Sequence, residues 1–590
     1  MSSEDAPSNP SAPPVSSAVV PPSSPPSGPT TARRKPGPDE TNVKETIESI
    51  LIAFILAFVF RAFVVEAFVI PTGSMAPTLL GAHMRYTCPD CGYQFDTNYN
   101  APSETTDGDP KIDPEAYPPA DIYCPNCGYK VAGPSGYTIP GTANRESGKI
   151  PVHYGDRILV LKYVYLLHDP QRWDVVVFKS PDVKPGVPDY TMNYIKRLVG
   201  KPGESLMVLN GDIYISTAEH PQWQVQHKPT DVQEAMWRVV YDNDFHPQGL
   251  SRLDEEGQPR SDEPQWRQPW VSSLGSGWNV EATPASKNGR VFTFDNLNGL
   301  GELQFDPKAN STTQTLTDYL VYDTMGARDR GLSRGPGEDG SPDDRYAPAV
   351  SDLKLAVDYT RNSGDGPLDL SLVKHESIDH TFTAELTPSD VLLWHIVGSQ
   401  KTLIGQEKLA NLGIDASKPI YVELMNVDYH VTLRLNGHEA LQPFDYAPNV
   451  DWLVAQWREH DPGRPGEAHI QADHQSCSLT HVGLWRDVYY TNRDNGGSNL
   501  RAATPDNPVH LGSGEYFVMG DNSEISGDAR YWNQPINLPH EGLKMASGRV
   551  PAQFMLGQAV FFYWPAGYQI PIFNTLLSII PNFGEMRWIH

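Results

Sequence analysis

An apolar segment near the N-terminus constrains this chain most. Residues 45–70 read ETIESILIAFILAFVFRAFVVEAFVI, and no polar side chain stands between Ile50 and Phe60. A helix of about 20 apolar residues crosses a hydrocarbon core of ~30 Å, and an arginine near its end can reach the interface. The segment therefore predicts a transmembrane helix over 45–68. A buried amphipathic helix is the alternative, but such a helix is rarely apolar on every face.

The residues before the apolar segment predict its orientation. Residues 1–44 are rich in proline and serine and hold few large apolar side chains, which is typical of a disordered tail. Basic residues precede the segment at Arg33, Arg34, Lys35 and Lys44. Because positive charge is retained on the cytoplasmic side, we expect a single-pass protein of the cell membrane. Its tail would be cytoplasmic, and everything after the span would lie on the outer face.

Length, charge and cysteine content exclude some classes of protein. A chain of 590 residues exceeds the roughly 250–300 residues at which a single core stops growing, so several domains are expected. The formal net charge of −26 disfavours a nucleic-acid partner. Five cysteines are too few for a disulfide scaffold of this size.

Ser74 is a candidate nucleophile directly after the apolar segment, in VIPTGSMAPTLLG at 69–81. A serine hydroxyl needs a base, yet no Gly-x-Ser-x-Gly elbow surrounds it and none of the 18 histidines stands in a motif that pairs with it. A buried lysine with a lowered pKa is the other known base. Residues 191–199 predict a strand that places Lys196 on one face and Arg197 on the other. A surface lysine is the alternative for Lys196.

Five segments resemble, in order, the conserved boxes of type I signal peptidases. They read PTGSMAPTLLG, GDRILVLKY (155–163), RWDVVVFKSP (172–181), YIKRLVGKPGESLMV and GEYFVMGDNSEISGDARYWN (514–533). The resemblance implies a mainly β catalytic core that follows one transmembrane helix. The core would consist of residues 69–81, 154–217 and 505–575, with two inserts between them.

The resemblance also implies a role for each matching residue. Ser74 would be the nucleophile and Lys196 the general base of a Ser-Lys dyad. Thr72 would supply a hydroxyl that stabilises the oxyanion together with the Ser74 N–H, and Ser526 would orient the lysine. Structural positions at the site would be Met75, Arg197, Asp521, Asp528 and Arg530. Ala529 departs from the family, which usually has a small hydroxyl residue or glycine there.

The function implied by the resemblance is that of a membrane-anchored serine endopeptidase without a catalytic cofactor. It would remove signal peptides from exported precursor proteins after small-x-small sites. Two alternatives stay open, namely a catalytically silent surface-binding protein that presents the inserts and a Ser-Lys autopeptidase with another substrate. The presence of both Ser74 and Lys196 argues against the first, and the apolar segment argues against the second.

The first insert, residues 82–153, contains two CPxCGY repeats. Each repeat offers two thiolates separated by two residues, and two such pairs form a tetrahedral four-sulfur zinc site. We therefore expect a zinc-ribbon-like insert with a structural metal. Two disulfides are the alternative in an oxidising compartment. The predicted ligands are Cys88, Cys91, Cys124 and Cys127, and the lone Cys477 is expected to be a buried apolar residue.

The second insert, residues 218–504, alternates apolar and polar residues in its later part. HTFTAELTPSDVLLWHIV and PIYVELMNVDYHVTLRLNGHEAL are typical of strands. Asn436-Gly437 predicts a hairpin turn in this insert, as Asn210-Gly211 does in the core. We expect a laminin-G-like or concanavalin-like β-sandwich over about 375–495. This domain would either bind a polysaccharide or a protein, or serve only as a structural spacer. The loop at 325–347 is expected to be flexible.

The C-terminal region is rich in aromatic side chains. Its apolar runs, including residues 576–590, are broken by prolines and are too short to span a bilayer. Trp564, Phe573 and Trp588 are candidate interfacial anchors, and burial in the core is the alternative for all three.

Overall fold

The computed structural model describes most of the chain after residue 42. The described residues are 43–99, 115–118, 121–133, 136–138, 145–146, 148–182, 190–249, 266–273, 275–281, 289–310, 316–323, 348–492, 501–538, 542–565, 568–572, 575–580 and 583–590. The predicted tail up to residue 42, the loop at 325–347 and Phe573 lie outside them. The chain divides into two compact units, Met1–Phe60 and Arg61–His590.

The apolar segment forms a helix that is shorter than predicted. Helix α1 spans Val43–Phe63 and ends in a turn before β1 (Val65–Val69), which pairs with β10 (Arg157–Leu161). The large apolar side chains from Ile47 to Phe63 are exposed. The predicted transmembrane helix over 45–68 is not confirmed, since β1 takes its last residues and Glu48 and Arg61 lie within α1. Among the described helices, none is long and apolar enough to cross a membrane.

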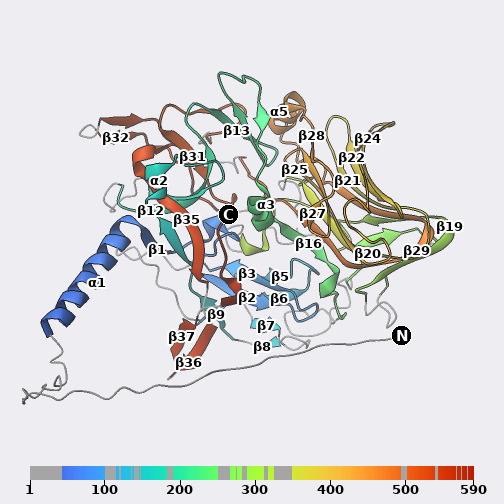
Figure 1. Cartoon of the computed structure of the whole chain (residues 1–590), viewed down its shortest axis with the longest axis horizontal. Coiled ribbons are helices and arrows are strands. Elements are labelled where there is room, and N and C mark those ends of the chain that lie inside the picture. The colour runs from blue at the N-terminus through green and yellow to red at the C-terminus, as the bar shows by residue number, and fades with distance from the viewer. Residues whose placement is uncertain are drawn as a thin grey trace, which may run out of the picture. The chain divides into compact units, whose positions relative to one another are not determined.

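One sheet of the second unit has seven strands, each antiparallel to its neighbours; Figure 1 labels β1, β12 (Asn193–Gly200), β31 (Glu515–Met519) and β35 (Met555–Trp564) among them. Its strands come from distant parts of the chain. Strand β35 lies between β10 and β11 (Val175–Lys179), and β31 lies beside β12. In spatial order the strands are β1, β10, β35 (Met555–Trp564), β11 (Val175–Lys179), β12 (Asn193–Gly200), β31 (Glu515–Met519) and β34 (Val550–Pro551). The mainly β prediction for the core is confirmed.

A second sheet packs against the first. Its order is β15 (Gln224–Val225), β14 (Asp212–Ser216), β13 (Ser205–Leu209) and β30 (Val509–His510). The predicted turn between β13 and β14 is confirmed, since Asn210 and Gly211 have φ of 51° and 93°. Such a turn requires positive φ at both residues. One apolar cluster joins the two sheets through Leu198, Val208 and Phe517.

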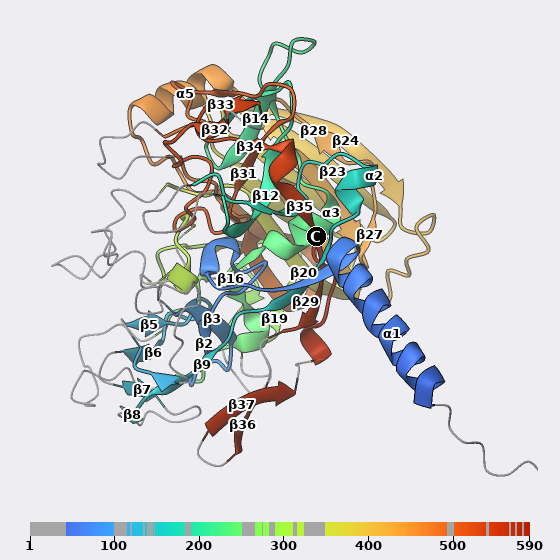
Figure 2. The same ribbon diagram turned by 90° about the vertical axis from the view of Figure 1, so that its left-hand side faces the viewer.

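The first insert forms two small sheets around the cysteines (Figure 2). All four cysteines lie in one buried cluster with Met84, Tyr86, Phe95 and Val152. One sheet consists of β3 (Gln94–Asn98), β2 (His83–Thr87), β9 (Ile150–His153) and β4 (Glu115–Ala116). The other consists of β5 (Ile122–Tyr123), β6 (Lys130–Gly133), β7 (Gly136–Thr138) and β8 (Arg145–Glu146).

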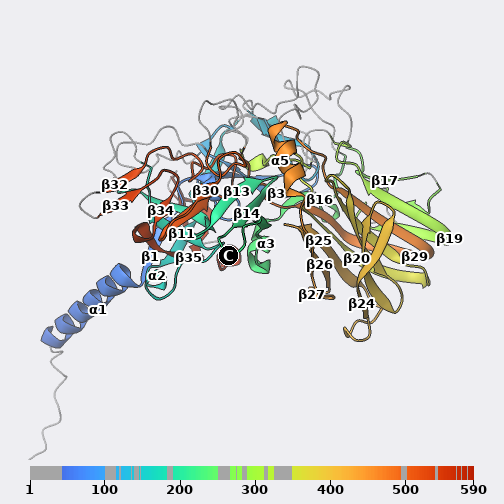
Figure 3. The same cartoon turned by 90° about the horizontal axis from the view of Figure 1, so that it is seen from above.

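Most of the second insert forms one large sheet, visible with its long curved strands in Figure 3. The 20-residue strand β29 (Glu467–Arg486) pairs with β19 (Phe292–Phe305) along one edge. Along the other edge it pairs with β20 (Leu353–Gly364) and then with β21 (Leu368–Lys374). The strands are β16 (Arg238–Asp242), β17 (Trp270–Ser272), β18 (Trp278–Asn279), β19 (Phe292–Phe305), β20 (Leu353–Gly364), β21 (Leu368–Lys374), β22 (His380–Leu386), β23 (Asp390–Val397), β24 (Gln400–Lys408), β25 (Ile420–Val427), β26 (His430–Leu435), β27 (His438–Glu439), β28 (Phe444–Asp445) and β29 (Glu467–Arg486).

The large sheet is more extensive than the alternation in the sequence predicted. Strands β16 to β20 belong to it although they precede residue 375, because β19 and β20 supply the partners of β29. The turn at Asn436-Gly437 is confirmed by φ of 51° and 80°. Burial alternates along β21 and β29, and Cys477 is buried in the apolar cluster as expected. The laminin-G-like or concanavalin-like sandwich stays a prediction.

The remaining elements are short. The helices are α2 (Val164–Leu167), α3 (Thr230–Met236) and α5 (Val450–Arg458), and the paired strands are β32 (Ile536–Leu538) with β33 (Leu543–Met545) and β36 (Tyr568–Ile572) with β37 (Thr575–Ile580). Trp588 is exposed and its ring contacts Phe561, with centroids 5.2 Å apart. Trp564 is half-buried under the Arg157 guanidinium.

Candidate active site

The candidate nucleophile and the candidate base lie in direct contact. Ser74 sits in η1 (Gly73–Met75), a short turn between β1 and β2, and Lys196 sits in the central strand β12. The Lys196 Nζ atom donates to Ser74 Oγ at 2.6 Å across 122 residues of sequence. Ser74 is 8% exposed and Lys196 is 5% exposed. The structure therefore brings the predicted dyad together in a largely dry environment.

Burial favours the neutral form of the Lys196 amine. It lowers the pKa of the Lys196 amine from its ordinary value to about 8, although the carboxylates of Asp528 and Asp521 raise it in part. Burial lowers a lysine pKa because an ammonium ion loses its hydration in the interior. A substantial fraction of the amine is therefore neutral near physiological pH, and a neutral amine can accept a proton from a hydroxyl.

Thr72 and Met75 flank the nucleophile. The Thr72 hydroxyl donates to Ser74 Oγ at 3.5 Å and is the predicted second donor for an oxyanion. Met75 is fully buried in an apolar cluster with Ile70 and Leu79. That cluster holds the serine turn against β1 and β10.

Ser526 lies beside the serine turn without the contact predicted for it. A Cβ atom on Gly520 would lie 2.3 Å from both Ser526 Oγ and the Ser74 carbonyl oxygen, so only glycine fits between them. The Ser526 hydroxyl is buried and has no hydrogen-bond partner in the described part of the chain. Its role in orienting Lys196 stays a prediction.

Two buried ion pairs hold the loop that follows β31. Arg197 binds Asp521 through Nε–Oδ1 and Nη2–Oδ2 contacts of 2.7 Å each. Arg530 binds Asp528 through contacts of 2.8 and 2.7 Å, and Asp528 also accepts the Gly520 N–H. Burial alone would raise the pKa of Asp528, but Arg530 beside it holds that pKa below its usual value. The predicted structural positions are thus brought together. Ala529 between them is fully buried.

Asn522, for which no role was predicted, binds the serine turn directly. Its backbone N–H donates to the Ser74 carbonyl at 3.1 Å, and its Nδ2 donates to the Gly73 carbonyl at 3.2 Å. The same Nδ2 donates to Asp323 Oδ1 at 2.6 Å. Asn522 is part of the Gly-Asp-Asn segment that the resemblance singled out, so its position there was the available signal.

Asp323 belongs to the second insert, and no sequence signal pointed to it. It ends η3 (Val321–Asp323), which also places the Tyr322 ring against the serine turn, since a Cβ atom on Gly73 would lie 2.4 Å from that ring. Beside this contact lies a cavity of about 380 Å³, lined among others by Pro77, Leu80 and Tyr322. The insert therefore contacts the serine turn through Tyr322 and its partner Asn522 through Asp323.

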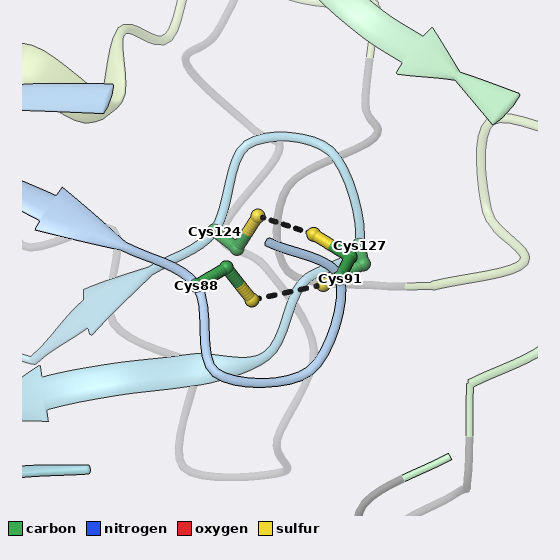
Figure 4. A group of neighbouring side chains, drawn as sticks. All are labelled: Cys88, Cys91, Cys124 and Cys127. Carbon is green, nitrogen blue, oxygen red and sulfur yellow. Dashed lines mark hydrogen bonds between the residues drawn. The ribbon is translucent and has the colours of Figure 1, made fainter. Parts of the chain in front are cut away.

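The four predicted metal ligands converge in the first insert (Figure 4). The Sγ atoms of Cys88 and Cys127 are 3.6 Å apart, as are those of Cys91 and Cys124. A tetrahedral zinc site with Zn–S bonds of about 2.3 Å has sulfur atoms about 3.8 Å apart. All five cysteines of the chain are free thiols, so the alternative of two disulfides is not what the structure shows.

The two cysteine repeats have the same backbone geometry. Gly92 and Gly128 have φ of 81° and 73°, and their N–H groups donate to the carbonyls of Cys88 and Cys124. Hydrogen bonds from the neighbouring thiols lower the pKa of Cys88, whereas burial raises the pKa of Cys124 and Cys127. The closely placed sulfur atoms are thus a donor set that could hold zinc.

Comparison with known proteins identifies the core. The family described as "Signal peptidase, peptidase S26" matches residues 43–97, 136–261 and 464–564. These segments contain Ser74, Lys196 and the loop after β31. The core of this chain is therefore similar to the signal peptidase family S26. Most of the large sheet, from 262 to 463, lies outside the match.

Named relatives of this core agree with the family match. Signal peptidase I of Pseudomonas aeruginosa is 36% identical over 88 residues, which are 15% of this chain and 26% of that protein. Signal peptidase I of Rickettsia typhi is 25% identical over 174 residues, which are 30% of this chain and 44% of that protein. The chain spans less than half of the length of either relative.

Solved structures match this chain only distantly. The potassium-bound carbohydrate recognition domain of Emp46p has a TM-score of 0.23 at 10% identity and covers 42% of this chain and 97% of its own. Sheep galectin-11 in complex with glycerol has a TM-score of 0.16 at 10% identity. The match covers 23% of this chain and 92% of the galectin chain. Scores this low assign no fold and no ligand to any part of the chain.

The contact from Asp323 predicts a measurable effect on the serine turn. We expect Asp323→Ala to slow the acylation of Ser74 by a serine-directed probe about 10-fold, because a buried hydrogen bond to a charged group contributes about 1.5 kcal/mol or more. The rate of probe attachment, followed by intact-protein mass spectrometry, measures this effect. Asp415→Ala, at an exposed loop of the large sheet, is the matched control. Equal rates for the two variants would contradict a positioning role for Asp323.

Proposed function

We propose that this chain is a serine endopeptidase of the signal peptidase type, with Ser74 as nucleophile and Lys196 as general base. The observation that carries the proposal is the 2.6 Å contact between Lys196 Nζ and Ser74 Oγ, made by a buried lysine whose pKa is lowered to about 8. Similarity to family S26 supports the same chemistry.

The proposed reaction has two stages. Neutral Lys196 takes the proton of the Ser74 hydroxyl while Oγ attacks the substrate carbonyl, and the resulting ammonium returns the proton to the leaving amine. The Thr72 hydroxyl and the Ser74 N–H stabilise the oxyanion in both stages. Water, activated by Lys196, then hydrolyses the acyl-enzyme. The buried pairs Arg197–Asp521 and Arg530–Asp528 keep β12 and the following loop in place while charge develops.

The proposed substrates are exported precursor proteins that carry signal peptides, cut after small-x-small sites. The relatives named signal peptidase I support this substrate class. A catalytically silent surface-binding protein is disfavoured, because it would not need a lysine buried against a serine. A polysaccharide or protein ligand for the large sheet stays a prediction.

The dyad is tested by cleavage of an exported precursor in detergent, with sequencing of the new N-terminus. We expect Ser74→Ala to abolish cleavage and Lys196→Ala to lower kcat by about 10²–10⁴-fold, as loss of a general base does. Lys179→Ala, on the neighbouring strand β11, is the matched control and should cleave normally. Cleavage by Ser74→Ala would refute the assignment of the nucleophile.

The pH profile supplies a second test of the same dyad. Because only the neutral amine accepts a proton, kcat/KM of the wild type should rise with pH and level off above about 8. A profile that is flat between pH 6 and 9 would contradict Lys196 as the base.

We also propose that α1 attaches the protein to a lipid surface. The support is the continuous exposure of its large apolar side chains, which include Ile50, Leu51, Phe54, Phe58 and Phe60. Exposed apolar surface of this extent is costly in water. The full chain should co-sediment with phospholipid vesicles, and a variant with Phe54, Phe58 and Phe60 replaced by Ser should stay in the supernatant. Co-sedimentation of both proteins would contradict the proposal.

The cysteine cluster is proposed to hold a structural zinc ion. Four sulfur ligands leave no open position, so the metal would stabilise the first insert and take no part in catalysis. In the zinc-loaded protein, Cys88, Cys91, Cys124 and Cys127 should resist alkylation until a chelator is added. Cys91→Ser should make the other three reactive without a chelator, whereas the control Cys477→Ala should leave all four protected. Rapid alkylation of the four thiols in the zinc-loaded wild type would overturn the assignment.

A further inference from the structure

Three metal-binding side chains outside the cysteine cluster and the active site lie close together. They are His227, which follows β15, His430 at the start of β26, and Asp445 at the end of β28. One ligand atom from each lies within 4.8 Å of the others. His430 Nδ1 is 2.5 Å from Asp445 Oδ1, and His227 Nδ1 is 3.8 Å from the same oxygen. The two imidazole rings have centroids 4.9 Å apart.

We propose that His227, His430 and Asp445 form a second metal site, which binds a divalent transition metal such as Zn²⁺. Two imidazoles and one carboxylate are ligands that zinc prefers, with bonds of about 2.0–2.2 Å. Tetrahedral ligands at that distance are about 3.3 Å from one another. The observed separations of 2.5 and 3.8 Å lie on either side of this value, so small side-chain rotations suffice.

The exposure of the three side chains suits a site that exchanges metal with solvent. The side chains of His227 and His430 are 36% and 29% exposed, and that of Asp445 is 64% exposed. With only three protein ligands, the remaining positions would be filled by water. The site differs in this from the closed four-sulfur cluster.

The charges around the site are compatible with a bound cation. Lys228, next to His227 in the sequence, has its ammonium group paired with two carboxylates, at 2.7 Å (Asp428) and 2.6 Å (Asp487).

A metal ion at this site would connect two parts of the chain. His227 lies within the segment that matches family S26, whereas His430 and Asp445 lie in the large sheet outside the match. The His227 carbonyl accepts the indole N–H of Trp173 at 2.9 Å, and the Trp173 carbonyl accepts Arg197 Nη1 at 2.6 Å. A metal ion here would fasten the large sheet to the peptidase core, two hydrogen bonds away from Arg197.

The test is titration of Zn²⁺ into full-length protein whose cysteine cluster is already loaded, followed by calorimetry. We expect the wild type to bind one further equivalent, and His430→Ala and Asp445→Asn to bind it at least about 10-fold more weakly, since changes even outside the ligand shell cost about 10–100-fold. His438→Ala, an exposed histidine on β27 of the same sheet, is the matched control and should bind like the wild type.

Hydrogen exchange provides a readout that does not depend on stoichiometry. Added Zn²⁺ should slow exchange at 226–230 and at 428–445 in the wild type and in His438→Ala, but not in His430→Ala. Unchanged exchange in the wild type, or equal Zn²⁺ affinity in all four proteins, would show a metal-free hydrogen-bonded pair of His430 and Asp445 and overturn the proposal. Neither readout depends on peptidase activity, so failure of the proposed function would leave this test intact.

Discussion

The buried ion pair between Arg197 and Asp521 is the interaction on which the rest of the core depends. It joins the central strand β12 to the loop after β31, and Arg197 also donates to the Trp173 carbonyl. Two fully buried charges are tolerated only with excellent geometry, and loss of one partner would leave an unpaired charge in the interior. Because Lys196 precedes Arg197 on the same strand, holding Arg197 on one face of β12 directs Lys196 to the opposite face. There it meets Ser74.

The large insert is built into the peptidase core through polar contacts as well as packing. Asp323 from η3 binds Asn522, which in turn binds the serine turn. On another side, Lys228 lies between Asp428 and Asp487 with all three side chains 2% exposed. A buried charged network of this kind specifies one docking geometry, because any other arrangement would leave charges unpaired. The proposed metal site of His227, His430 and Asp445 lies at the same junction.

Sequence patterns predicted local features and residue types well. The turns at Asn210-Gly211 and Asn436-Gly437 follow from positive φ, which depends on two residues alone. The convergence of the four cysteines follows from two repeats of the same short motif. The extent of the large sheet was underestimated, because the partners of β29 in β19 and β20 carry weaker alternation than β29 itself. The transmembrane helix was predicted from composition, whereas Val65–Val69 pair in a sheet.

By itself the sequence determined which residues are available for chemistry: a serine after an apolar segment, a lysine in an apolar strand and two pairs of cysteines. These are properties of short segments, where neighbours along the chain decide conformation. Tertiary structure alone decided that Lys196 loses its hydration beside Ser74, that Asp323 reaches Asn522 across 199 residues, and that two histidines meet Asp445. The physical reason is that pKa shifts, buried hydrogen bonds and ligand clusters depend on desolvation and on distances between remote segments, which no local pattern encodes.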